Sequence, residues 1–193
     1  MKARFQTWLA VSCLACASAL AAAPPNRTAH IDDTAHLLPP IPGDLDVLEG
    51  RLADFESRTG IKILVEFHER SPSANDDKVP GAYMRTLSAR LGVREHGVLL
   101  VYFGEDGDWR VWIGDDLTAR FAGKPGTVKQ LTASGAIHDV KEALLESARA
   151  KADVALAALQ KNLPGDELPS QAERARVQLD AMLEALMAKF APK

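Results

Sequence analysis

Carboxylate side chains gather at three breaks in the pattern of the chain, and they are the groups best suited to chemistry. Hard divalent cations such as Ca²⁺ and Mg²⁺ bind where several carboxylate and carbonyl oxygens are held together. The residues that would form such a site are Asp32, Asp33, Glu95, His96, Asp115 and Asp116. The alternative is that Asp33, Asp115 and Asp116 cap turns and that Glu95 is solvated.

Histidines offer a second kind of metal site. His30, His36 and His96 would join the carboxylates in a mixed Zn²⁺ or Cu²⁺ site. The spacing of His30 and His36 on an irregular segment does not define a tetrahedron. No serine lies in a Gly-x-Ser-x-Gly turn, so nucleophilic catalysis has little support. No catalytic residue is assigned, and whether the chain is an enzyme stays open.

A hairpin must position most of these groups. Residues 97–103 (GVLLVYF) are continuously apolar and rich in β-branched and aromatic residues, which predicts a strand covered on both faces. An Asp-Gly step follows and favours a tight turn. Residues 109–113 (WRVWI) then alternate, which places Trp109 and Trp112 on opposite faces, so at most one is free for ligand contact. Since a hairpin returns the chain to its start, the loops at 94–96 and 115–116 should lie together.

The flanking segments predict an α/β fold. Asp44 is a good N-cap for a helix that stops at Gly60, and a strand follows at 61–68. A second helix closes at Gly92 before the apolar strand. A helical crossover of this length implies parallel pairing. We therefore expect a three-layer α/β/α arrangement whose mixed sheet is mostly parallel.

The last part of the chain is helical. One long helix runs from about 137 to 163, and Ser170 caps a final helix. The final helix carries apolar residues at helical spacing, at Leu179, Met182, Leu186 and Phe190. This face suits packing on the sheet, on the preceding helix or on a partner's helix, so self-association through it is one alternative. The two helices form a C-terminal helical hairpin.

The first 23 residues resemble an export signal. Lys2 and Arg4 precede an apolar stretch and then small residues, which predicts a signal peptide at 1–21 with cleavage within 21–23. A retained anchor helix and a lipoprotein at Cys16 are the alternatives. Cleavage would remove Cys13 and Cys16, the only cysteines, and in a bacterial cell the exported protein would reach the periplasm. No later segment has the ~20 apolar residues of a membrane span. The net charge of −3 gives no reason to expect a nucleic-acid partner.

The order of these segments resembles the TPM domain. The resemblance covers residues 30–132 and rests on the acidic segment 31–38 (IDDTAHLL), the Thr59-Gly60 step into a strand, and a tyrosine-bearing crossover helix. Its best match is 95–101 (EHGVLLV) followed by the hairpin at 110–114. Known members include thylakoid-lumen proteins of photosystem II repair, a modulator of acetylcholine receptors, and many exported bacterial proteins.

The resemblance implies a division of the chain and two functions. It divides the chain into the signal, a TPM-like α/β domain at 24–135 and a helical extension at 136–193. Members are thought to gather metal or phosphate at the N-terminal loop and the two strand-end loops. The first implied function is an envelope accessory or binding module with a Ca²⁺ or Mg²⁺ site and an unknown envelope partner.

The second implied function is a metal-dependent acid phosphatase acting on phosphate monoesters, in which Asp33 or Asp116 would orient water. Two departures from the family pattern weaken the transfer of both the metal and the phosphatase. Thr118 stands where a glutamate is usual, and His96 stands where an Asn or Asp usually precedes the strand's glycine.

Overall fold

The structure is a computed structural model that describes residues 29–165 and 167–191. The predicted signal peptide, its cleavage point and both cysteines lie outside these residues. In chain order the elements are β1 (Ile31–Asp32), α1 (Asp44–Thr59), β2 (Lys62–His68), α2 (Ala82–Arg90), β3 (Gly97–Phe103), β4 (Asp108–Ile113), a 3-10 turn (Asp115–Leu117), α3 (Thr118–Ala122), α4 (Val128–Ala133), α5 (Ala136–Gln160) and α6 (Gln171–Lys189).

A four-stranded sheet organises the fold, with strand order β1-β2-β3-β4. The pairs β1–β2 and β2–β3 are parallel, whereas β3–β4 is antiparallel. The predicted mixed, mostly parallel sheet is therefore confirmed. The sequence pattern did not predict β1, because its two residues are too few to show any periodicity.

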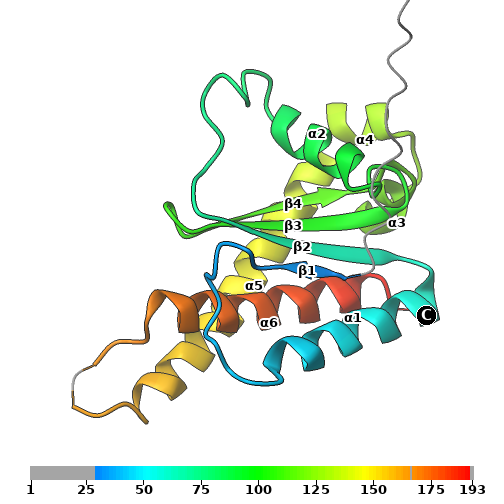
Figure 1. Cartoon of the computed structure of the whole chain (residues 1–193). Coiled ribbons are helices and arrows are strands. Elements are labelled where there is room, and N and C mark those ends of the chain that lie inside the picture. Colours follow the sequence, from blue (N-terminus) through cyan, green and yellow to red (C-terminus); the bar gives the residue numbers. More distant parts are fainter. Residues whose placement is uncertain (1–28, 166, 192–193) are drawn as a thin grey trace, which may run out of the picture.

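The sheet lies between two helical layers (Figure 1). On one face, Val65, Leu100 and Val111 pack against α1, α5 and α6 in the main core. On the other face, Leu64 and Leu99 pack against α2 in a smaller core. Every residue of β3 is buried, which agrees with its prediction as a strand covered on both faces. The three-layer α/β/α class is confirmed.

The C-terminal helices belong to the same core as the sheet. Leu179, Leu183, Leu186 and Phe190 of α6 and its C-cap are fully buried and join the cluster that contains the sheet residues. The predicted boundary between 135 and 136 thus does not separate two cores. The apolar face of α6 that offered self-association as an alternative is covered within one chain.

An ion pair between α1 and α6 corrects one local prediction. The N-cap of α1 is Gly43, with φ 77°, rather than Asp44. Asp44 instead accepts hydrogen bonds from Arg176 on α6, from Nε at 2.5 Å and from Nη2 at 2.7 Å. The predicted cap of α6 is confirmed, since Ser170 forms a reciprocal capping box with Glu173. No helix among the described residues is long and apolar enough to cross a membrane.

Candidate functional site

The loops before β3 and after β4 are joined at one end of the sheet, as the hairpin predicted. Asp115 N donates to the carbonyl of Arg94 at 3.1 Å, and Asp116 N donates to the carbonyl of Glu95 at 3.0 Å. Gly114 permits this approach, because a Cβ there would lie 2.5 Å from Glu95 O. The sequence therefore requires a glycine where the two acidic loops touch.

Side chains of these loops pair with one another at the surface. His96 Nδ1 lies 2.7 Å from Asp116 Oδ2, and its Nε2 lies 3.9 Å from Glu95 Oε2. Arg94 Nε lies 4.0 Å from Asp115 Oδ2. The side chain of His96 is 75% exposed, so these are solvent-screened contacts of small energetic weight.

Asp32 and Asp33 lie elsewhere. Asp32 is in register with Glu66 and, through it, with Val101 of β3, five residues beyond His96. At about 3.3 Å per residue this is about 17 Å along the strands. The carboxylate of Asp33 accepts from Leu37 N at 2.7 Å and from Leu38 N at 3.0 Å. Asp33 is therefore a turn cap, as the alternative interpretation held.

The six predicted metal ligands thus form two separate groups. Glu95, His96, Asp115 and Asp116 lie at one end of the sheet, and Asp32 and Asp33 lie toward the other. Among residues 29–165 and 167–191, no group of three or more His, Cys, Asp or Glu side chains is placed to hold a metal ion. The donors as they stand do not fit a bound cation, and cation binding stays a prediction.

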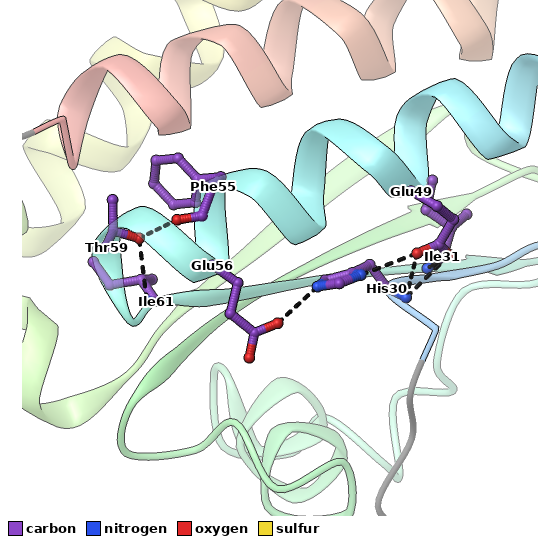
Figure 2. A network of polar contacts seen from close by, with 7 residues as sticks. All are labelled: His30, Ile31, Glu49, Phe55, Glu56, Thr59 and Ile61. Atoms are coloured by element: carbon purple, nitrogen blue, oxygen red, sulfur yellow. Dashed lines mark hydrogen bonds and ion pairs between the residues drawn. The ribbon is translucent and has the colours of Figure 1, made fainter.

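The three histidines are also dispersed. His36 is exposed on the turn that Asp33 caps, with φ 53°. His30 is buried, and each of its ring nitrogens meets a carboxylate of α1 (Figure 2). Nδ1 lies 3.0 Å from Glu49 Oε2, and Nε2 lies 2.8 Å from Glu56 Oε2. A neutral imidazole has one N–H, so the tautomer of the ring decides which of the two contacts it donates.

Glu49 fixes β1 to the helical layer. Its Oε1 accepts from Ile31 N at 2.8 Å and from His30 N at 3.0 Å, and its Oε2 accepts from His30 N at 2.9 Å. Burial works to raise the pKa of Glu49, but the hydrogen bonds from His30 and Ile31 prevail and lower it. The sequence pattern did not predict this network, because Glu49 and Glu56 look like ordinary polar residues of an amphipathic helix.

A second histidine lies at the carboxyl end of β2. His68 Nδ1 lies 2.9 Å from the hydroxyl of Tyr83 on α2, and its ring packs edge-on to Phe103. Burial raises the pKa of the Tyr83 phenol, so the phenol stays protonated at neutral pH. This contact joins α2 to the sheet.

A large hollow of the described surface is a cleft along the outer side of β4. Its volume is about 1040 Å³, and it is bounded by β4, by α2 and by α5. Its walls include Arg85 of α2, Trp112 of β4 and Lys141 of α5. Sequence reasoning did not find this cleft, because its walls come from segments far apart in the chain. The alternation in β4 did predict that Trp109 and Trp112 face opposite ways, and only Trp109 is core.

Trp112 is an aromatic platform between two cations. The guanidinium carbon of Arg85 lies 6.0 Å from the ring centroid, and Lys141 Nζ lies 5.9 Å from it. The indole N–H donates to the carbonyl of Arg94 at 3.2 Å, which fixes the ring. Burial lowers the pKa of Lys141. Such a site attracts anions, because two cations share one apolar surface.

No protein-family model matches the chain, and no curated protein matches its sequence.

Proposed function

We propose that the protein is an exported, periplasmic accessory or binding module of the cell envelope, of the TPM type, and that it binds its partner in the cleft along β4. The observation that carries the proposal is the cleft itself. Its walls present two cations on an aromatic ring beside an outer strand, which are groups that hold a ligand.

The order of elements supports the TPM resemblance. The Thr59-Gly60 step ends α1, where Gly60 has φ 70° and its N–H bonds to the carbonyl of Glu56. Tyr83 of the crossover helix packs on the sheet, and residues 95–101 lead into the central strand. These are the positions on which the resemblance rests, and each has a structural reason in this fold.

Site-directed photo-crosslinking in cells tests the binding function. A photoreactive amino acid replaces Glu142, an exposed residue of α5 on the cleft wall, in the full chain. The matched control replaces Val154, which is 73% exposed on the same helix away from the cleft. We expect adducts with periplasmic or membrane proteins from position 142 alone. Equal adducts from both positions, or recovery of the protein in the cytoplasmic fraction, would contradict the proposal.

The second candidate is a divalent-cation site at the paired loops, with phosphatase activity depending on it. Its support is that the fold brings Glu95, His96 and Asp116 together. Thermal unfolding in EDTA, and then with Ca²⁺, Mg²⁺, Mn²⁺ or Zn²⁺ added singly, tests it. An ion at 100 times its dissociation constant adds about 2.7 kcal/mol, a shift of several degrees.

Asp116→Asn is the informative variant for the cation site. Asp116 is exposed and its carboxylate does not cap a turn, whereas Asp33→Asn would destabilise the chain in any buffer. A shift that Asp116→Asn removes would make turnover of an aryl phosphate the next assay. No shift with any ion would refute the cation site and the metal-dependent phosphatase together.

A further inference from the structure

The outer edge of β4 carries backbone groups without a described partner. Gly114 N donates to Gly97 O at 2.8 Å, so the β3–β4 pairs in phase with it exchange hydrogen bonds across the hairpin. Trp109, Val111 and Ile113 are the alternate residues, whose N–H and C=O point away from β3. No strand of the described chain lies on that side, and no hydrogen bond within residues 29–165 and 167–191 uses these groups. Natural sheets usually protect such an edge.

The cleft opens along this same edge. Trp109, Val111 and Ile113 line it, together with residues of α2 and α5 on either side. An added strand would lie about 4.8 Å from β4, and a strand matching its six residues is about 20 Å long. The cleft therefore runs along the edge of β4, beside the outward backbone groups of Trp109, Val111 and Ile113.

The charged side chains of the cleft indicate which side chain a bound peptide strand would carry. Arg110 is paired with Asp77 at 2.9 Å, and Arg94 lies 4.0 Å from Asp115. Arg85 and Lys141 form no ion pair within 4.0 Å among the described residues, although Asp108, Glu142 and Glu146 also line the cleft, and each of the two cations lies over the ring of Trp112. The side chain of a strand residue opposite Trp112 would project on the same face of the sheet as Trp112, toward Arg85. Burial lowers the pKa of Lys141, and a carboxylate at that point would offset this effect.

We propose that the cleft takes an extended peptide segment of a partner protein, which pairs with β4 as a fifth strand and sets an acidic side chain against Arg85 and Lys141. The inference rests on the proposed function and names its ligand. A small anion would use the two cations alone, whereas a strand uses both them and the free backbone groups of Trp109, Val111 and Ile113.

Selection from a displayed library of random seven-residue peptides tests the proposal. The bait is the full chain, compared with Lys141→Met and Arg85→Gln, and with Lys151→Met as the matched control on the same helix. Lys151 pairs with Glu184 and does not line the cleft. We expect enrichment of Asp or Glu by the unmodified chain and by Lys151→Met, and loss of that enrichment in the two cleft variants.

Two synthetic relatives of the most enriched peptide test the mode of binding. Replacing its acid by the matching amide should weaken binding about tenfold or more, because a charge-assisted hydrogen bond is lost. N-methylation of alternate amides on the side that pairs with β4 should abolish binding, since it removes the donors for the edge while the charge remains. Circular dichroism of each protein variant confirms that it is folded.

Three outcomes would overturn the peptide proposal. These are no enrichment, the same enrichment with Lys141→Met, or undiminished binding of the N-methylated peptide. Stabilisation by inorganic phosphate that depends on Lys141, without any enriched peptide, would assign the cleft to a small anion instead. Cleft-specific crosslinks together with a failed selection would leave the binding function standing, whereas the loss of those crosslinks would refute both.

Discussion

Replacing Glu49 by glutamine tests the network that fixes β1 to α1. The carboxylate accepts from the backbone N–H groups of Ile31 and His30 at 2.8 to 3.0 Å, and its Oε2 also lies 3.0 Å from Nδ1 of His30. Glutamine keeps one acceptor oxygen but turns an NH₂ group toward the remaining donors. The substitution therefore replaces one carboxylate oxygen by an NH₂ group and leaves the volume of the side chain nearly unchanged.

The expected loss of unfolding free energy is about 3 kcal/mol, because hydrogen bonds to a charged group contribute about 1.5–3 kcal/mol each and do not add fully. The matched control is Glu56→Gln. Glu56 meets only Nε2 of His30, its side chain is 39% exposed, and an amide oxygen can still accept that bond. We expect a loss of about 1 kcal/mol or less for the control.

The two variants should also differ in their pH dependence. The folded state lowers the pKa of Glu49 below its ordinary value of 4.5. Glu49 therefore contributes stability that is fully present above about pH 4.5 and is lost as the pH falls through the lower folded-state value. The stability gap between the unmodified chain and Glu49→Gln should narrow over that range.

Urea unfolding followed by tryptophan fluorescence measures both effects, because Trp109 lies in the core. The proposed role of the Glu49 carboxylate is refuted if Glu49→Gln costs no more unfolding free energy than Glu56→Gln at neutral pH. It also fails if the gap for Glu49→Gln stays constant or widens as the pH is lowered from 5 toward about 3.

The remaining predictions concern local contacts, each measured by thermal unfolding. Gly114→Ala should lower the unfolding free energy by about 1–3 kcal/mol, because it forces the two acidic loops apart. Gly50→Ala, on the open surface of α1, should leave stability unchanged or raise it by up to about 1 kcal/mol. Equal effects of the two variants would contradict the close approach at Gly114. Asp44→Asn should lower the unfolding free energy by about 1–3 kcal/mol at neutral pH. The loss should shrink progressively below pH 3.8, because the guanidinium of Arg176 lowers the pKa of Asp44. The control Asp46→Asn, at an exposed neighbouring position, should change stability little. Ser170→Ala should cost about 1 kcal/mol through loss of the cap of α6, and an unchanged midpoint would show that the capping box contributes nothing.

Local patterns were enough to predict the centre of the sheet. The apolar run of β3 indicated burial on both faces, and the alternation of β4 put Trp109 and Trp112 on opposite faces. Ser170 was recognisable as a cap because a capping box needs only residues three positions apart. These features depend on neighbours in the sequence, so a single sequence contains them.

Features that depend on distant partners were not predictable in the same way. Asp44 has the chemistry of an N-cap, but Arg176, 132 positions away, takes its carboxylate. Asp32 and Asp33 were expected beside the strand-end loops because β1 was not foreseen, and its parallel pairing directs them toward the other end of the sheet. The platform at Trp112 depends on cations from two helices whose polar residues look ordinary in isolation.

The burial of α6 also bears on how the protein is made. Helix α1, which α6 contacts through the ion pair of Asp44 and Arg176, is synthesised long before α6, because these two residues are 132 positions apart. Until α6 emerges, the apolar faces of α1 and of the sheet that it covers remain exposed to solvent and to chaperones. Synthesis therefore includes a long interval in which the chain cannot yet complete its main core.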